Sequence, residues 1–351
     1  MNNGDDVKHP GRTNRFLLVT RILGRVLSAR IHWRGPLILC HLVTGHCNCR
    51  CESCLWRDSS SEDLTLDEIR ALYRDARDLG FVMNFLWGGE PLMRKDFPAL
   101  LRCSREMGFV NVINTNGWYL ADRLDEIGPY TESLIVSLDH PSEKHDEIRG
   151  KKGLFKRVLQ GVGETRVRYP GIKVFFNFLL TNNNKDVIEE SVRLADDLGV
   201  SFYVCPMEIG LLRSGAIEGE KDHLKATKGE EALVADTLIR LKHEGFKVNN
   251  SYLYLDNIRR GKRPYRCHFP KMVLQVGPEG DVIDCRAWDR PIGSIRRRSL
   301  KELYYHERIK ELAGPEGEQC NKCNNPNRID MSYFWELRRE PVASVVKMFL
   351  N

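Results

Sequence analysis

Six apolar segments of strand length alternate with amphipathic helical segments between residues 36 and 206. Such alternation is typical of parallel βαβ units, whose right-handed crossovers build either an open sheet or a barrel. In parallel barrels the functional site lies in the loops that follow the strands. We therefore expect an α/β fold with its site at one end of the sheet. The predicted strands are residues 36–43, 81–87, 110–115, 132–139, 173–181 and 201–206.

The segments between these strands carry apolar residues at helical spacing. In the first of them, Thr65 and Glu68 form a capping-box pattern, and Gly80 marks the end of the helix. This pattern predicts that each strand returns to the next through a helix that packs on the sheet. The predicted helices are residues 64–80, 97–108, 119–128, 154–169, 185–199 and, beyond the sixth strand, 230–245.

The alternation of predicted strands and helices ends after residue 263. A hairpin is predicted at 272–285, where alternating strands flank a Pro/Gly turn, and a short helix is predicted around 299–312. These features indicate a second, smaller domain. The predicted divisions are an N-terminal helix at 1–34, a core domain at 35–210, a connecting helical segment at 211–262, the second domain at 263–330 and a C-terminal tail at 331–351.

The N-terminal segment at 14–31 reads as a basic amphipathic helix. Ile22 and Val26 lie on its wide apolar arc, whereas Arg21 and Arg25 lie on the opposite arc. Two interpretations follow. The apolar arc packs on the core, which we prefer, or the helix lies on an anionic membrane surface with its arginines facing the lipid. The apolar C-terminal segment at 342–351 would then add a second membrane contact.

Composition excludes several classes of protein. No apolar run approaches the roughly 18 residues of a transmembrane helix, and the polar, acidic N-terminus differs from a signal peptide. A net charge of +6 over 351 residues gives no reason to expect a nucleic-acid partner. The eleven cysteines are clustered rather than evenly spread, which favours metal binding or redox chemistry in the cytoplasm over a disulfide framework.

The densest cysteine cluster directly follows the first predicted strand. Cys47, Cys51 and Cys54 have the spacing C-x3-C-x2-C, and a loop this short can wrap three thiolates around one iron–sulfur cluster. Three ligands leave one iron of a [4Fe-4S] cube open to a substrate or cofactor. Cys49 lies between the first two and is expected to point elsewhere. The alternative is a structural zinc knuckle completed by a distant ligand, such as His41 or His46.

Three further motifs follow later strands in order. They are WGGEP at 87–91, NTNG at 114–117, and SLD at 137–139 with its continuation to Arg149 and Gly150. Together with the cysteine loop they resemble the radical S-adenosylmethionine (SAM) superfamily over residues 36–206. The resemblance implies a partial (β/α)6 barrel. It also implies that SAM is bound by Gly88, Gly89, Glu90, Asn116, Ser137, Asp139 and Arg149.

The resemblance assigns a task to each of these residues. Glu90 would accept the ammonium group of SAM, Ser137 and Asp139 would approach the ribose, and Arg149 would lie near the carboxylate. These assigned tasks suit the chemistry of the side chains, because carboxylates pair with ammonium groups and guanidinium groups pair with carboxylates. The chain departs from the family pattern at Ser53, where the family usually has an aromatic residue. Contact with the adenine is then expected from Leu55 or Trp56.

A second set of four cysteines lies in the predicted C-terminal domain. Cys267 and Cys285 bracket the hairpin, and Cys320 and Cys323 form C-x2-C. Four thiolates suit a second [4Fe-4S] cluster or a structural zinc ion. The pattern resembles the auxiliary-cluster module of the family called twitch, a shortened SPASM domain, which favours iron–sulfur. The remaining Cys40 and Cys103 are expected to be buried, whereas Cys205 ends the sixth strand, where the substrate pocket of the family opens.

The resemblance implies an enzyme with two [4Fe-4S] clusters and SAM. Reductive cleavage of SAM would give a 5′-deoxyadenosyl radical that removes hydrogen from an unactivated carbon, and a reductant such as flavodoxin or ferredoxin would supply the electron. The auxiliary cluster would accept an electron or bind the substrate. The substrate is a lipid, a peptide or a small molecule, and the apolar terminal segments lean toward a membrane lipid. The alternative of another class is a non-catalytic iron–sulfur or zinc-binding protein.

Overall fold

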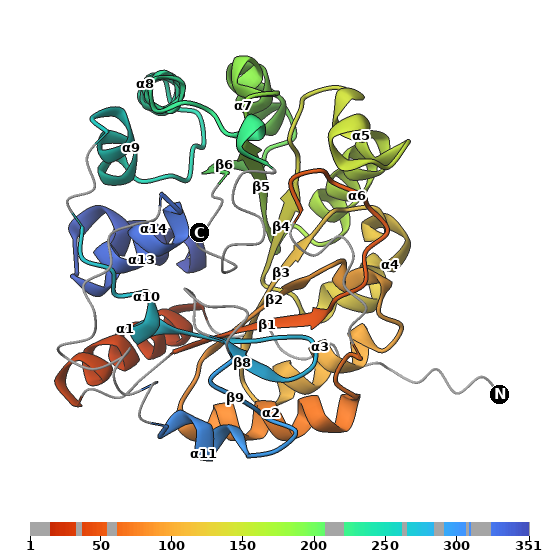
Figure 1. The fold of residues 1–351 in the computed structure, drawn as a ribbon, viewed down its shortest axis with the longest axis vertical. Helices are drawn as coiled ribbons and strands as arrows, with labels where there is room; N and C mark the ends of the chain where they lie inside the picture. The colour runs from red at the N-terminus through yellow and green to blue at the C-terminus, as the bar shows by residue number, and fades with distance from the viewer. Residues whose placement is uncertain are drawn as a thin grey trace.

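The computed structural model describes residues 15–32, 37–54, 62–207, 221–261, 265–283, 291–306, 309 and 324–350. Within these residues, nine strands form one sheet in the order β6-β5-β4-β3-β2-β1-β7-β8-β9 (Figure 1). Strands β1 to β6 are all parallel, and the sheet does not close. The six predicted strands are confirmed as β1 (Ile38–Thr44), β2 (Met83–Gly88), β3 (Val110–Thr115), β4 (Ser133–Ser137), β5 (Lys173–Leu180) and β6 (Ser201–Pro206).

Helices cover the outer face of the parallel strands (Figure 1). Thr65 and Glu68 form the predicted capping box, and Gly80 ends the first of these helices in the left-handed region at φ 89°. The buried outer-face residues, such as Leu86, Ile113 and Phe176, form the main core with the inward side of the helices. These helices are α2 (Leu66–Leu79), α3 (Phe97–Glu106), α4 (Leu120–Ile127), α5 (Lys144–Arg149), α6 (Leu154–Arg168) and α7 (Ile188–Asp197). Helix α8 (Lys228–His243) packs on α7, and α9 (Tyr252–Arg259) packs on α8 and α13.

The predicted C-terminal hairpin is part of the main sheet rather than a sheet of its own. Strand β7 (Val273–Val276) pairs in parallel with β1, and β8 (Asp281–Ile283) and β9 (Gly293–Ser294) extend the sheet in antiparallel fashion. Within 299–312 the described residues form α11 (Leu300–Tyr304), which packs on α2. The C-terminal segment is thereby attached to the barrel at the edge formed by β1.

Two C-terminal helices were not assigned by the sequence prediction, and the first of them crosses the predicted boundary at residue 330. They are α13 (Pro326–Trp335) and α14 (Arg339–Leu350), and the short α10 (Phe269–Met272) packs against α13. Phe334 and Trp335 of α13 are buried in a second core with Cys40 and Val112 of the inner sheet face. The inner face of the partial barrel is therefore covered by C-terminal helices, while the outer face is covered by the helices of the βα units.

The N-terminal helix α1 (Arg15–His32) packs on the protein through its apolar arc. Ile22 and Val26 are buried in the second core, and α1 lies against α14. Arg21 donates a hydrogen bond to the carbonyl of Gly108 at 2.8 Å, and Arg25 donates one to the carbonyl of Leu79 at 3.2 Å. Both carbonyls lie at helix C-termini, where a cation is favoured. The preferred packing interpretation is confirmed, whereas association with a membrane surface stays a prediction.

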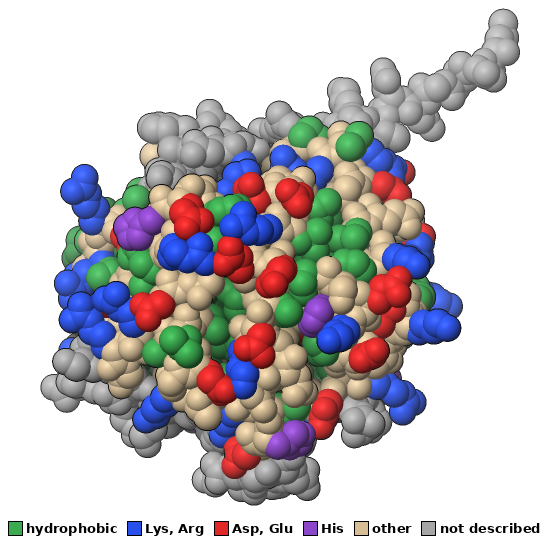
Figure 2. Space-filling view, turned by 90° about the horizontal axis from the view of Figure 1, so that it is seen from above, with side chains coloured by type: hydrophobic (Ala, Val, Ile, Leu, Met, Phe, Trp, Pro, Cys, Tyr) green, Lys and Arg blue, Asp and Glu red, His purple; other side chains and the backbone are tan. Residues whose placement is uncertain are grey.

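Acidic and basic side chains are interspersed on the exposed face seen in Figure 2, which looks down on Figure 1 from above. This face carries no broad field of one sign. None of the described helices combines the length and the apolar character needed to cross a bilayer. Leu27 and Ile31 remain exposed on α1.

The two arginine contacts of α1 predict how the protein behaves with vesicles. Arg21 and Arg25 each bond a carbonyl group of the protein itself, which competes with binding to anionic headgroups. We expect the full-length protein to stay in the supernatant when it is centrifuged with anionic vesicles at low salt. Pelleting that is lost when Leu27 and Ile31 are both changed to Ser would contradict this expectation.

Candidate cofactor site

The cysteine loop lies at the carboxyl end of β1, where the βα arrangement predicts a site. The described cysteines form no disulfide with one another. Contact with the neighbouring Cys49 thiol, followed by the charge of Arg149, lowers the pKa of Cys51 to about 6. The Cys49 thiol also lowers the pKa of Cys47. Thiolates, rather than thiols, ligate iron, so the loop is electrostatically prepared for a metal cluster.

The sequence suggested that Cys49 points away from its neighbours, but the structure shows that it faces them. Its side chain is buried and lies within hydrogen-bonding reach of the thiols of Cys47 and Cys51. Its backbone N–H donates to the Cys47 sulfur at 3.4 Å. The contacts with the two neighbouring thiols raise the pKa of Cys49 itself. Of these three thiols, Cys49 is therefore the one whose pKa is raised, while the pKa values of Cys47 and Cys51 are lowered.

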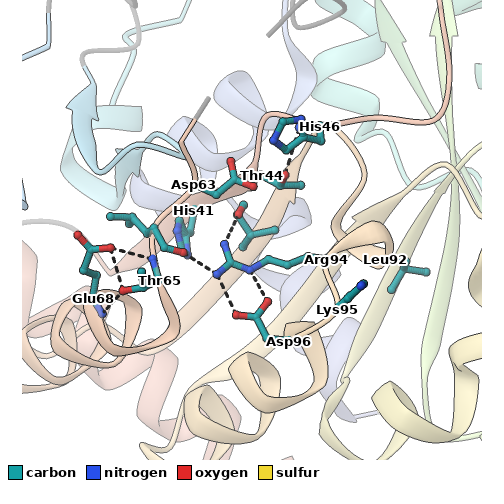
Figure 3. A network of polar contacts seen from close by, with 12 residues as sticks. His41, Thr44, His46, Asp63, Thr65, Glu68, Leu92, Arg94, Lys95 and Asp96 are labelled. Carbon is teal, nitrogen blue, oxygen red and sulfur yellow. Dashed lines mark hydrogen bonds and ion pairs between the residues drawn. The ribbon is translucent and has the colours of Figure 1, made fainter. Parts of the chain in front are cut away.

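The ends of the cysteine loop are held together by Arg94, which the sequence reasoning missed (Figure 3). Its guanidinium group donates to the carbonyl of Val43 at 2.7 Å and to that of Leu64 at 2.5 Å, and it pairs with Asp96 at 2.7 Å. Val43 precedes the loop and Leu64 follows it. The only signal in the sequence was the position of Arg94, three residues after the WGGEP motif.

His41, considered as a zinc ligand, lies in the outer layer of the fold. It is fully buried, and its Nδ1 lies 2.9 Å from the hydroxyl of Tyr73 on α2. Burial lowers the pKa of His41 to about 3, so the ring is neutral. His46 is exposed in the loop, and its backbone N–H donates to Thr44. His41 therefore acts in the contact between β1 and α2 and not with the cysteines.

The two glycines of the WGGEP motif let β2 approach the beginning of the cysteine loop. A Cβ atom on Gly88 would lie 2.3 Å from the carbonyl oxygen of Thr44, and one on Gly89 would lie 2.1 Å from that of His46. Gly88 also has φ 139°, which side-chain-bearing residues rarely adopt. The backbone N–H groups of Gly89 and Glu90 donate to Thr44 and His46, each at 2.8 Å. The glycines are thus required by the backbone of the chain itself.

Glu90 is completely buried and accepts three hydrogen bonds from the protein. The donors are the backbone N–H of Leu92 at 2.9 Å, the hydroxyl of Thr115 at 2.7 Å and the backbone N–H of Asn116 at 2.6 Å. Burial raises the pKa of Glu90, and the three bonds oppose that rise. A carboxylate offers about four acceptor positions, so one remains for a ligand. Glu90 therefore joins β2 to β3 and retains one acceptor position, which suits an ammonium group.

Asn116 connects the end of β3 to the cysteine loop. Its amide nitrogen donates to the side-chain oxygen of Asn48 at 2.7 Å and lies 3.8 Å from the sulfur of Cys47. The amide nitrogen of Asn48 and the amide oxygen of Asn114 are buried without a partner among the described residues. Buried polar atoms normally have partners. These orphaned groups at the carboxyl ends of the strands fit a polar cofactor.

Asp139 and Arg149 form an ion pair, with Nε and Oδ2 2.5 Å apart. Asp139 is buried and also accepts a hydrogen bond from the backbone N–H of Leu179 at 2.9 Å. The carbonyl of Arg149 lies 3.6 Å from the sulfur of Cys51, and its guanidinium lies 3.9 Å from the same sulfur. The contacts of Asp139 and Arg149 with the ribose and with the carboxylate of SAM stay predictions, and the structure shows the two residues bonded to each other. Ser137 is buried at the end of β4.

Of the predicted auxiliary ligands, only Cys267 is described, and it is half-buried between the two cores. Cys285, Cys320 and Cys323 lie outside the described residues, as do Leu55 and Trp56. Cys40 and Cys103 are buried as expected. Burial raises the pKa of Cys40 to about 12, and its sulfur accepts a hydrogen bond from Trp87 at 3.0 Å. Cys205 is half-buried, with its sulfur 3.6 Å from the amide nitrogen of Asn325.

The fold and the thiolate loop define an iron–sulfur enzyme built on a partial barrel. The sequence model of the radical SAM superfamily matches residues 42–195, and that of the SPASM iron–sulfur cluster-binding domain matches residues 267–324. The second match begins at Cys267 and includes Cys285, Cys320 and Cys323. The chain belongs to the radical SAM superfamily. Its cofactors are therefore a [4Fe-4S] cluster and SAM, with auxiliary iron–sulfur in the SPASM domain.

Two relatives match most of the chain. A pre-heme d1 synthase of Dinoroseobacter shibae is 30% identical over 299 residues, covering 77% of this chain and 73% of that protein. An Fe-coproporphyrin III synthase of Methanosarcina barkeri is 26% identical over 299 residues, covering 77% of this chain and 74% of that protein. Both relatives are named for reactions that produce tetrapyrroles.

A solved structure shares the fold at lower sequence identity. SuiB of Streptococcus suis bound to S-adenosylmethionine has a TM-score of 0.67 and 15% identity, over 95% of this chain and 82% of that chain. A further structure of SuiB is bound to the precursor peptide SuiA. This likeness extends across the C-terminal helices as well as the barrel.

The contacts of Glu90 lead to a prediction about cofactor affinity. Replacement of Glu90 by Gln removes the negative charge, and we expect SAM affinity to fall at least tenfold because a charge-assisted bond contributes about 1.5–3 kcal/mol. Cluster absorbance should persist, since Glu90 is not placed as an iron ligand. The measurement is equilibrium binding of SAM to the reconstituted protein.

Thr115→Val provides the matched control for Glu90→Gln. It removes one donor to Glu90 at a cost in folding stability, yet it leaves the carboxylate charge in place. This variant should bind SAM within about threefold of the wild type. Equal losses of affinity in both variants would mean that Glu90 acts only by holding β2 to β3.

Proposed function

We propose that the protein is a radical SAM enzyme that removes hydrogen from a side chain of a carboxylate-bearing tetrapyrrole. The observation that carries the substrate class is the similarity to two tetrapyrrole-forming enzymes over more than three quarters of the chain. The lean toward a membrane lipid rested on apolar terminal segments. It loses the support of α1, because the apolar arc of that helix is buried in the second core.

In this proposal Cys47, Cys51 and Cys54 hold the SAM-cleaving cluster. When bound, the cluster and SAM supply a 5′-deoxyadenosyl radical. Glu90 receives the ammonium group at its one remaining acceptor position. Arg149 lies beside the cluster loop and is fixed there by Asp139. Asp139 is thus a positioning residue in addition to its expected place near the ribose.

Gly88, Gly89, Asn116 and Ser137 complete the proposed cofactor site. The glycines set the distance between β2 and the cysteine loop, and Asn116 ties the end of β3 to Asn48. Because these contacts join the ends of β1, β2 and β3, they would hold the reacting groups in one orientation.

Helix α13 crosses the inner face of the sheet, where we place the substrate. Arg328 of this helix is 9% exposed, and its guanidinium group lies 5.6 Å from the centre of the Phe269 ring. Arg328 lies close enough to Cys40 of β1 to influence its thiol electrostatically, and Asn325 of the same helix reaches Cys205 of β6. Helix α13 therefore spans the inner face.

The auxiliary cluster would accept the electron that remains on the substrate after hydrogen removal. Its proposed ligands are Cys267, Cys285, Cys320 and Cys323, from which one [4Fe-4S] cluster is expected. The required reductant is a flavodoxin or a ferredoxin.

The division of labour between the two clusters predicts the behaviour of Cys320→Ala. The SAM-cleaving cluster should assemble in this variant, because its ligands come from the β1 loop. A strong chemical reductant should therefore still give 5′-deoxyadenosine, measured by chromatography, while product formation falls more than tenfold. A soluble variant that converts substrate at the wild-type rate would show that the second cluster has no catalytic part.

The substrate class is tested by turnover in the presence of defined compounds. We expect coproporphyrin III or its iron complex to increase 5′-deoxyadenosine above the substrate-free rate, with a matching mass change in the tetrapyrrole. The tetraethyl ester of coproporphyrin is the control, because it lacks the carboxylates, and it should not stimulate. A protein that is stimulated by a peptide and by no tetrapyrrole would overturn the substrate assignment. A protein that contains metal but does not cleave SAM would be a non-catalytic metal-binding protein.

A further inference from the structure

A basic surface lies directly outside the cysteine loop. It consists of Arg50, Trp118, Lys151 and Lys152, and we call it the loop-side basic surface. Arg50 lies within the loop, between Cys49 and Cys51, and is exposed. Lys152 is exposed on the segment that follows α5. The surface is distinct from the inner face of the barrel, where the substrate is proposed to bind.

Close backbone packing brings the parts of this surface together. The N–H of Arg50 donates to the carbonyl of Arg149 at 3.0 Å. A Cβ atom on Gly150 would lie 3.1 Å from the Cβ of Arg50, so no side chain fits between the two segments. Lys151 follows immediately, and its ammonium group lies 4.1 Å from the centre of the Trp118 ring. The cation–π contact places a cation and a flat apolar ring side by side.

The same residues are a few bonds from the sulfur atoms proposed to hold the cluster. The backbone N–H of Trp118 donates to the side chain of Asn116 at 2.9 Å, and Asn116 lies 3.8 Å from the sulfur of Cys47. On the other side, the carbonyl of Arg149 lies 3.6 Å from the sulfur of Cys51. A partner seated on this surface would therefore approach the cluster from outside through one layer of protein.

The four residues of the surface include no acidic side chain, and the exposed Glu147 of α5 borders it. In the part of the chain that the structure describes, no ion pair involves Arg50, Lys151 or Lys152. The neighbouring Asp146 accepts hydrogen bonds from the backbone N–H groups of Gly153 and Phe155. Glu52 pairs with His223 at 2.9 Å, farther along the loop. A cationic surface of this kind attracts an acidic protein over long distance.

We propose that the loop-side basic surface receives an acidic one-electron carrier protein, which reduces the SAM-cleaving cluster. The inference rests on the proposed function, because that function requires one electron per SAM cleaved. In the step itself, the carrier loses one electron and the cluster held by the cysteine loop gains it. No bond forms or breaks and no proton is transferred. Trp118 supplies the apolar centre of the contact, and the cations supply its complementary charge.

The test uses the reconstituted full-length protein and a reduced flavodoxin as the probe. Reoxidation of the flavodoxin is followed by its own absorbance in an anaerobic stopped-flow instrument. Lys151→Glu/Lys152→Glu should lower the second-order rate constant at least tenfold at low ionic strength. The wild-type rate should fall steeply with added salt, whereas the rate of the variant should depend on salt weakly or with the opposite sign.

Arg297→Glu/Arg298→Glu is the matched control, because it changes net charge by the same amount. These arginines are exposed between β9 and α11, which lies far from α5 in Figure 1. Flavodoxin should reduce the cluster of the control variant at nearly the wild-type rate. Iron content and the rate of 5′-deoxyadenosine formation with a chemical reductant should be unchanged in both double variants. If the glutamates impair folding, Lys151→Gln/Lys152→Gln provides a milder neutralisation, with an expected loss of about threefold.

Two results would overturn the proposal. One is a flavodoxin rate that the Lys151/Lys152 variant leaves unchanged, and the other is an equal loss of rate in the control variant. Failure of the proposed function is a separate observation, since a chemically reduced wild-type cluster would then yield no 5′-deoxyadenosine. Flavodoxin reoxidation can be measured in either case, because it reports electron transfer and not SAM cleavage.

Discussion

The buried carboxylate of Glu90 is the interaction on which the geometry of the cofactor site depends. It accepts hydrogen bonds from the loop after β2 and from the end of β3. Its own backbone N–H bonds to His46, at the base of the cysteine loop. A buried carboxylate is costly unless hydrogen bonds compensate for lost hydration, and this residue has such bonds on both oxygens. Three strand ends are thereby fixed relative to one another.

The remaining contacts extend this arrangement around the sheet. Arg94 closes the cysteine loop by binding the carbonyl groups on either side of it. Asn116 links β3 to the loop, and Arg149 with Asp139 links the β4 segment to Cys51. The positive charge of Arg149 and the thiol of Cys49 both favour thiolates in the loop. The same contacts that position the strands therefore also prepare the sulfur atoms for iron.

The strand order and the position of the site were predictable because hydrophobic periodicity and the βα alternation are local signals. Each motif also lies directly after a strand, so the rule for parallel barrels placed them together. The side-chain partners were less accessible. Nothing in the spacing shows that Cys49 faces Cys47 and Cys51, because the turn that brings it there depends on backbone contacts with Arg149. The pairing of Asp139 with Arg149 likewise depends on α5, which the sequence did not indicate.

The C-terminal segment was harder to predict than the barrel for a related reason. Pairing of β7 with β1 joins segments more than 200 residues apart, and periodicity carries no information about such pairs. The apolar residues of α1 gave the same pattern for a membrane surface and for a protein core. Only the buried contacts of Ile22 and Val26, together with the carbonyl partners of Arg21 and Arg25, distinguish the two.

The central claim is that Cys47, Cys51 and Cys54 hold a SAM-cleaving cluster while Cys49 only supports it. Iron content after anaerobic reconstitution tests this most directly. The wild type should contain about eight irons per chain, four for each cubane cluster, and Cys51→Ala about four. Cys49→Ser, which keeps a hydrogen-bond donor in the same loop, should retain about eight. Loss of half the iron in Cys49→Ser, or about eight irons in Cys51→Ala, would contradict the assignment.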